Sequence, residues 1–183
     1  MIKNIFLNAQ LMTFGLAAIS AFALSMAFTA QYIFGLEPCI LCLYQRIPYA
    51  LVIALGLTGF LTAPKCKLGA AFFIILSGFV FLANSALAFY HSGIEQHWWR
   101  SHLEGCAVPE LEGSITDVLA TIEARTEAVR CDEPSWLDPV FGLSMANYNA
   151  AFCFGLFALC LLSGTAIWRK AKADRAAKKA CGV

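Results

Sequence analysis

The stretch LGAAFFIILSGFVFLANSALAFY, residues 68–90, contains no Asp, Glu, Lys, Arg or His. A helix needs about 20 apolar residues to cross a hydrocarbon core about 30 Å thick, and this stretch is long enough to do so. It is also too long and too continuously apolar for one strand of an outer-membrane barrel. The stretch therefore predicts a transmembrane helix. Three further runs lack the same five residue types, at 4–36, 47–64 and 139–168.

Together these runs predict an all-α integral membrane protein, a four-helix transmembrane bundle with spans at about 11–34, 47–62, 68–89 and 147–168. The whole chain has 60% hydrophobic and only 14% charged residues, which excludes an ordinary soluble domain. Its length of 183 residues fits one membrane domain that covers the whole chain. Nothing in the composition points to a nucleic-acid partner.

The distribution of Lys and Arg predicts the orientation of the bundle. Loops rich in these residues stay in the cytoplasm. We therefore expect both termini, including a basic tail at 169–183, to be cytoplasmic and two loops, 35–46 and 91–144, to face outward, which is the periplasmic side in a bacterial inner membrane. The basic residues that would share the cytoplasmic side are Lys3, Lys65, Lys67, Arg169, Lys170, Lys172, Arg175, Lys178 and Lys179.

The eight cysteines separate by side of the membrane under this topology. An even number would lie in the outward loops, where disulfides form and persist, and redox chemistry is expected of these: Cys39, Cys42, Cys106 and Cys131. The other cysteines would be reduced in the cytoplasm, as for Cys66 and Cys181, or packed as small apolar residues on the fourth helix, as for Cys153 and Cys160.

The first outward pair forms a Cys-x-x-Cys motif within the sequence PCILCLYQR, residues 38–46. A helix starting near Pro38 would aim its free backbone N–H groups and its positive dipole end at the thiols and lower their pKa. Arg46 would lie one helical turn from Cys42, where a permanent cation stabilises a thiolate or the oxygen of a bound quinone as it gains negative charge. Pro48 leaves the start of this helix open.

Other uses of a Cys-x-x-Cys motif fit this chain less well. Covalent haem attachment requires His after the second Cys, where this chain has Leu43. Zinc requires a second close pair of ligands, but Cys106 and Cys131 are widely separated and the three histidines are not grouped. We therefore expect no metal. A permanent bridge within the motif would close too small a ring to constrain the unfolded chain.

The second outward pair, Cys106 and Cys131, brackets a segment whose residues 114–122 carry apolar side chains at helical spacing. That spacing predicts a short amphipathic helix on the membrane surface. Alone, a bridge between the two cysteines would indicate a static staple worth about 3 kcal/mol. The Cys-x-x-Cys motif facing the same compartment favours a relay, because thiolates attack neighbouring disulfides and two pairs can pass electrons.

This ordered set of features resembles the bacterial disulfide bond formation protein B (DsbB) family along nearly the whole chain. The resemblance implies a protein-dithiol:quinone oxidoreductase of the bacterial inner membrane. It would reoxidise the periplasmic thiol oxidase DsbA and reduce ubiquinone or menaquinone. The matching features are the four spans, Pro-Cys-x-Leu-Cys-x-x-x-Arg at 38–46, Tyr-His-Ser-Gly-Ile-Glu-Gln at 90–96, Cys106, Cys131, and Phe-Gly-Leu-Ser-Met at 141–145.

The resemblance also implies an order of electron flow. The partner's thiolate would attack Cys106 and release Cys131, which would then attack Cys39 and free Cys42 beside the quinone. Cys106 lies in a segment with Gly105 that we expect to be reachable from solvent, whereas Cys131 is expected near the membrane. The Glu-rich loop between Cys106 and Cys131 leaves open whether the client is a general DsbA or a dedicated thiol oxidase.

The expected quinone-binding residues are Arg46, His91 and Gln96, the last two because the third span ends near them. Two other functions remain open. One is a non-catalytic membrane subunit stapled by disulfides. The other is a quinone oxidoreductase of the vitamin-K-epoxide-reductase type, whose Cys-x-x-Cys motif lies near the end of the bundle rather than before the second span.

Overall fold

Four long helices make up most of the computed structural model, which describes residues 8–101, 103, 106 and 130–180. Each helix contains a stretch long and apolar enough to cross a membrane. The predicted all-α membrane fold is therefore confirmed, and the described residues add only one isolated extended bridge. The helices are α2 (Ala9–Tyr32), α3 (Ile40–Thr62), α4 (Lys67–Glu95) and α6 (Met145–Ala180).

The helix that carries the Cys-x-x-Cys motif begins earlier than the span predicted at 47–62. α3 starts at Ile40 with Cys39 as its N-cap residue, so the loop predicted at 35–46 ends before Ile40. Pro48 lies inside α3. A proline is tolerated there because neighbouring groups in a membrane bundle satisfy the backbone groups that it leaves unpaired.

α4 and α6 also extend beyond the spans predicted from the apolar runs. α4 continues to Glu95, so the large loop predicted at 91–144 begins about one turn later. α6 continues to Ala180, so the basic tail predicted at 169–183 is helical as far as that residue. Apolar runs mark only the part of a helix that lipid requires, whereas the backbone hydrogen bonds continue past it.

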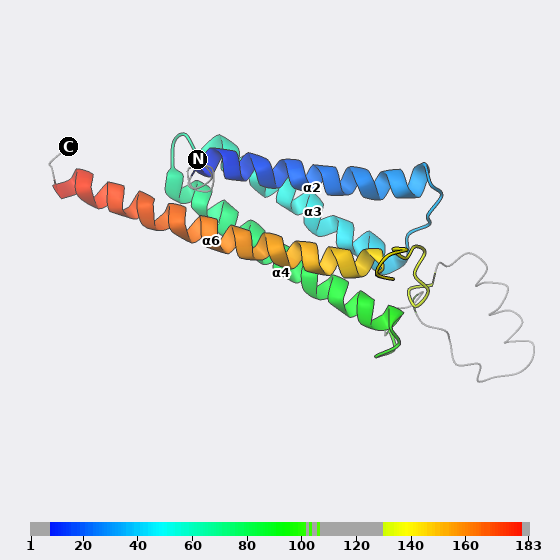
Figure 1. Cartoon of the computed structure of the whole chain (residues 1–183). Coiled ribbons are helices and arrows are strands. Elements are labelled where there is room, and N and C mark those ends of the chain that lie inside the picture. Colours follow the sequence, from blue (N-terminus) through cyan, green and yellow to red (C-terminus); the bar gives the residue numbers. More distant parts are fainter. Residues whose placement is uncertain (1–7, 102, 104–105, 107–129, 181–183) are drawn as a thin grey trace, which may run out of the picture.

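The helices pack as two pairs, α2 on α3 and α4 on α6, which are joined mainly through α3 and α4. The start of α2, the turn between α3 and α4 and the C-terminal part of α6 lie at one end of the bundle (Figure 1). The start of α3, the end of α4 and the start of α6 lie at the other end. Which end faces the cytoplasm stays a prediction. The helix predicted at 114–122, and Cys181, lie outside the described residues.

The outer surface of the bundle is apolar. Large side chains such as Phe22, Leu61 and Leu162 are exposed on α2, α3 and α6 respectively. A soluble protein rarely exposes so much apolar surface, but a bilayer solvates it. The exposed side chains therefore support lipid contact along the helices.

Small residues bring α2 and α3 close together. Gly56 and Gly59 on α3 are buried against Thr13 and Ala17 of α2. Membrane helices associate through close backbone packing of this kind, because lipid gives no hydrophobic force between them. The close packing of α2 on α3 therefore requires glycine at these two positions, because a larger residue would separate the helices.

Gly56→Ala should loosen this pair, because the added carbon would lie 2.8 Å from the Thr13 carbonyl oxygen and 3.0 Å from Ala17 Cβ. Overpacking of this kind costs about 1–3 kcal/mol. Thermal unfolding of the purified protein in detergent should show a lower midpoint. Gly15→Ala is the matched control, because an added carbon there meets nothing within 4 Å. Equal midpoints for the wild type and Gly56→Ala would contradict this account of the packing.

Candidate functional site

The Cys-x-x-Cys pair lies at the first turn of α3. The Cys39 sulfur caps the helix and accepts a hydrogen bond from the backbone N–H of Cys42 at 3.4 Å. The two sulfur atoms are 3.2 Å apart and both thiols are free. Cys39 is buried, whereas Cys42 is partly exposed. The structure thus holds the two sulfur atoms close together without a bond between them.

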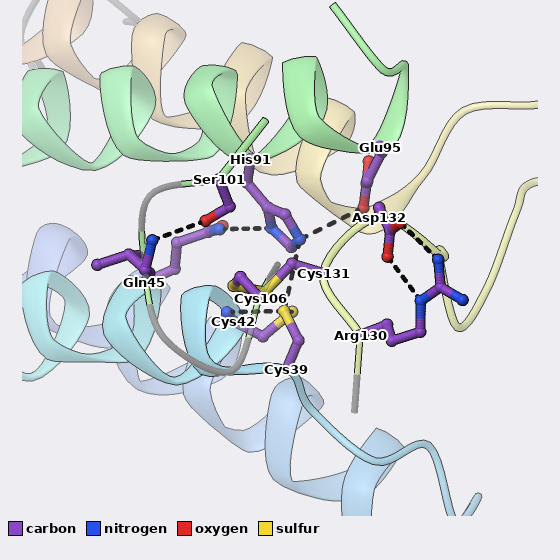
Figure 2. Close-up of a disulfide and its surroundings, with 11 residues drawn as sticks. Cys39, Cys42, Gln45, His91, Glu95, Ser101, Cys106, Arg130, Cys131 and Asp132 are labelled. Atoms are coloured by element: carbon purple, nitrogen blue, oxygen red, sulfur yellow. Dashed lines mark hydrogen bonds and ion pairs between the residues drawn. A yellow bond between two sulfur atoms is a disulfide. The ribbon is translucent and has the colours of Figure 1, made fainter. Parts of the chain in front are cut away.

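A disulfide joins Cys106 to Cys131, with 4.9 Å between their Cα atoms. Both residues belong to the same buried cluster as Cys39, so the disulfide and the free thiols pack together (Figure 2). The loop that carries Cys131 is held near α3 by a hydrogen bond from the Ser135 hydroxyl to the Glu37 carbonyl at 3.4 Å. Two pairs far apart in sequence therefore form one redox-capable site.

Cys106 differs from the expectation that it would be reachable from solvent. Its exposed fraction is 3%, because the disulfide draws it into the cluster with Leu41 and Ile94. Cys131, expected near Cys39, is buried in that cluster. Both cysteines of the disulfide are therefore buried in the structure.

The charges beside Cys131 are paired with one another. Arg130 contacts Asp132 at 2.6 Å and Glu133 at 3.1 Å. The hydrogen bond from Arg130 lowers the pKa of Asp132. The guanidinium of Arg130 is therefore committed to carboxylates and adds little net positive charge near Cys131.

His91 on α4 lies between the thiols and two polar side chains. Its Nε2 atom is 3.4 Å from Cys39 Sγ and 3.7 Å from Glu95 Oε1. Its Nδ1 atom is 3.0 Å from Gln45 Nε2. Glu95 is itself fixed by a hydrogen bond from the Ser144 hydroxyl at the start of α6. His91, expected as a quinone-binding residue, therefore contacts Cys39 directly.

The surroundings hold the pKa of Cys39 well below its ordinary value. The largest cause is the hydrogen bond with Cys42, and the contact with His91 acts in the same direction. Burial opposes both effects. The position at a helix N-terminus also favours a thiolate, as expected from the sequence. Cys39 is thus prepared to exist as a thiolate when the pair is reduced.

The ligand atoms of Cys39, Cys42 and His91 lie within 4.8 Å of one another. Sulfur and imidazole nitrogen are also the ligands of zinc sites. This grouping could not be predicted from the sequence, because His91 is far from the cysteines along the chain. The free thiols beside a disulfide nevertheless favour redox exchange as the use of this cluster.

Arg46 lies one turn after Cys42 on α3 and faces α2. Its Nη1 atom donates to Gln31 Oε1 at 2.6 Å, and its guanidinium carbon lies 5.0 Å from the centroid of the Phe28 ring. Gln96 is the exposed C-cap residue of α4. The structure therefore places Arg46 and Gln96 at the same end of the bundle as the cysteines, but on different helices.

Sequence reasoning missed Gln45 and Glu95 as residues of the site. Both could have been found from helical spacing, since Gln45 follows Cys42 by three positions and Glu95 follows His91 by four. Cys160 packs against Gly78 as a small residue, as expected. Cys153 is also buried in the apolar core, as expected, and its sulfur in addition contacts the Tyr49 hydroxyl at 3.2 Å.

A free Cys-x-x-Cys pair packed on a disulfide, at one end of four membrane-spanning helices, defines a membrane thiol–disulfide oxidoreductase. Comparison with known proteins then names the family. The profile of the family "Disulfide bond formation protein DsbB" matches residues 9–163. The chain belongs to the DsbB family, which confirms the resemblance noted in the sequence.

Three relatives match over most of their length. An uncharacterized protein of Rickettsia prowazekii is 30% identical over 148 residues, 80% of each chain. The "Disulfide bond formation protein B" of Herminiimonas arsenicoxydans is 29% identical over 85% of this chain and 94% of its own. That of Acinetobacter baumannii is 24% identical over 85% and 90%. No solved structure gives a significant match.

Reduced Cys39 should react as a thiolate at neutral and mildly acidic pH. Because its pKa is lowered, the thiolate is present above that lowered value and is lost only as the pH falls through it. The measurement is the rate of iodoacetamide modification of Cys39, followed by mass spectrometry across a pH series. Cys42→Ala removes the hydrogen-bond donor and should move the inflection up, towards the value of about 8.5 of an ordinary thiol.

Cys160→Ala is the control for this experiment, because Cys160 is buried elsewhere in the bundle. It should leave the pH profile of Cys39 unchanged. An identical profile in Cys42→Ala would show that the neighbouring thiol does not set the reactivity of Cys39.

Proposed function

We propose that this protein is a protein-dithiol:quinone oxidoreductase that reoxidises a periplasmic DsbA-like thiol oxidase and passes two electrons to a membrane quinone. The observation that carries the proposal is the buried cluster that contains both a free Cys-x-x-Cys pair and the Cys106–Cys131 disulfide. Membership of the DsbB family supports it. The proposal places the protein in the bacterial inner membrane, with both termini cytoplasmic and the cysteine cluster at the periplasmic surface.

The exchange begins with both pairs oxidised. A thiolate of the partner attacks Cys106, so a mixed disulfide forms and Cys131 leaves as a thiolate. Cys131 then attacks Cys39, which breaks the Cys39–Cys42 bond and leaves Cys42 as a thiolate. Their common cluster keeps the distance between Cys131 and Cys39 short.

The cycle continues when the partner's second thiol attacks its own sulfur in the mixed disulfide and frees Cys106. Cys106 attacks Cys131, re-forms the loop disulfide and releases Cys39. The partner is then oxidised by two electrons and the Cys-x-x-Cys pair is reduced by two. This product state matches the arrangement in the structure, a Cys106–Cys131 disulfide beside free Cys39 and Cys42.

The low pKa of Cys39 suits its role as the sulfur that leaves in this last exchange. A thiol of lower pKa leaves a disulfide faster. The Cys42 thiol and His91 both stabilise the departing thiolate. The local electrostatics therefore favour the step that returns the loop pair to its oxidised form.

The residues around Arg46 fit a quinone. The exposed ring of Phe28 lies beside this cation, and Leu43 and Ile47 are exposed on the neighbouring part of α3. An apolar surface with one permanent cation suits a flat molecule that carries carbonyl oxygens. When bound, a quinone supplies an acceptor for two electrons and two protons. We propose Arg46 as its main polar contact, with further contacts from His91 and Gln96.

Turnover should require all four cysteines of the cluster. The assay mixes the purified protein with a reduced DsbA-like oxidase and a soluble quinone analogue, and follows quinone absorbance and partner thiols together. Cys39→Ser should abolish quinone-linked oxidation because serine cannot exchange disulfides. Cys66→Ser is a matched control, since Cys66 is the N-cap residue of α4 as Cys39 is of α3, and serine also caps helices. Loss of turnover in Cys66→Ser, or full turnover in Cys39→Ser, would refute the proposal.

The same materials identify the sulfur that the partner attacks. Cys131→Ser, mixed with a partner that lacks its own resolving cysteine, should accumulate a mixed disulfide with Cys106 that dithiothreitol cleaves. Peptide mass spectrometry maps the bond. A linkage to Cys39 or Cys42 would contradict the proposed order of exchange.

Arg46→Ala should raise the apparent KM for the quinone analogue roughly ten- to hundredfold, because a hydrogen bond to a charged group contributes roughly 1.5–3 kcal/mol. Reduction of the Cys-x-x-Cys pair by the partner should be nearly unchanged. Arg169→Ala, an exposed arginine at the other end of the bundle, is the control. If only the partner step slowed in Arg46→Ala, Arg46 would belong to the partner interface instead.

A further inference from the structure

A chain of hydrogen bonds leads from the redox site into the middle of the bundle. Gln45 of α3 reaches His91 at 3.0 Å on one side and accepts from Asn149 Nδ2 of α6 at 2.6 Å on the other. Asn149 Oδ1 in turn accepts from the Tyr49 hydroxyl at 2.5 Å. Gln45, Tyr49 and His91 are buried. Three helices therefore contribute to one continuous polar chain.

The inner end of the chain is anchored at Cys153. The Cys153 thiol donates to Asn149 Oδ1 at 3.3 Å, and its sulfur accepts from Asn84 Nδ2 at 3.4 Å. Asn149 Oδ1 thus receives hydrogen bonds from both Tyr49 and Cys153. These two donors hold the carbonyl end of the Asn149 amide towards the middle of the bundle.

The direction of donation follows from this anchor. A carbonyl oxygen only accepts, so Asn149 presents its NH₂ group to Gln45 Oε1. Gln45 must then present its own NH₂ group to His91, and Nδ1 of His91 must accept. The ring proton therefore belongs on Nε2. That nitrogen faces the Cys39 sulfur at 3.4 Å and Glu95 Oε1 at 3.7 Å.

We propose that Gln45, Asn149 and Tyr49 are positioning residues that hold His91 as a neutral ring protonated on Nε2, so that it donates to the sulfur of Cys39. The inference deepens the proposed function and rests on it for its role in turnover. The titratable groups that face His91 are Cys39 and Cys42 at the start of α3 and Glu95 on α4, and the backbone of Cys131 also contacts the ring.

A neutral donor serves disulfide exchange better than a full positive charge. It stabilises the Cys39 thiolate when that sulfur is released. A fully charged ring would stabilise the thiolate further, but the nucleophilicity of a thiolate falls as its pKa falls. Cys39 must also bond again with Cys42 in each cycle. The polar chain keeps a second proton off His91 and thereby limits how strongly the ring stabilises the Cys39 thiolate.

Nitrogen NMR of the full-length, reduced protein with isotope-labelled histidine tests this inference in detergent micelles. The two neutral forms of the ring and its doubly protonated form give distinct pairs of nitrogen shifts. We expect His91, assigned by the loss of its signals in His91→Gln, to carry one proton, on Nε2. A proton on Nδ1, or on both nitrogens, would overturn the proposal.

Gln45→Glu changes the chain with almost no change of shape. The carboxylate still accepts from Asn149 but offers no donor to Nδ1, so His91 should become protonated on both nitrogens. The Cys39–Cys42 equilibrium in a glutathione buffer should then shift about tenfold towards the dithiol, the equivalent of one pKa unit for Cys39. Gln10→Glu makes the same chemical change at an exposed site at the other end of the bundle and should change neither readout.

Tyr49→Phe removes only one of the hydroxyl and thiol donors that orient Asn149. It should allow the amides to turn and produce a mixture of the two neutral forms of His91. If Gln45→Glu and Tyr49→Phe both leave the His91 spectrum as in the wild type, the polar chain does not position the proton. If Gln45→Glu fails to fold, the spectra of Tyr49→Phe and of the wild type still show whether the polar chain positions the proton of His91.

Neither readout uses the partner or a quinone. A wild-type ring protonated on Nε2, in a protein that fails quinone-linked turnover, would refute the proposed function and leave the positioning inference standing. Full turnover with a doubly protonated ring would do the reverse.

Discussion

The interior of a membrane bundle offers no water, so a buried polar side chain must find its partner within the protein. Side-chain amides join the helices in this way, with Gln45 of α3 paired to His91 of α4 and to Asn149 of α6. The reactive sulfur of Cys39 lies at the outer end of this arrangement. The geometry of the redox site is therefore a property of how the helices pack rather than of a surface loop.

The start of α3 serves two purposes with the same atoms. The Cys39 sulfur accepts the N-terminal hydrogen bond of the helix and is also a redox-capable atom. A helix N-terminus offers unpaired N–H groups and a positive dipole end, and both favour a thiolate. The Cys106–Cys131 disulfide packs on this end of the helix. The start of α3 thus both favours the Cys39 thiolate and holds the Cys106–Cys131 disulfide close to it.

The fold could be predicted because each of its helices contains a continuous apolar run, as at residues 68–90. The helix ends could not be predicted, since Cys39 caps α3 and α4 continues to Glu95 for reasons of capping and backbone hydrogen bonding that composition does not show. The cysteine motifs marked the chemistry, but the contact between His91 and Cys39 joins residues far apart in sequence. The polar contacts of Cys153 could not be predicted either. A cysteine on an apolar helix face has the same sequence pattern whether or not its sulfur contacts a polar group.

The pairing of Gln45 with Asn149 also bears on how the protein is made. Helices of a polytopic protein emerge from the ribosome in chain order, so Gln45 and Tyr49 are synthesised with α3 well before Asn149 follows in α6. Until the last helix arrives, the amide of Gln45 lacks the partner that accounts for one of its two hydrogen bonds. An amide in hydrocarbon is costly. A chain that stops before α6 would therefore leave the Gln45 amide without its Asn149 partner, so the redox site is complete only once the last helix has packed.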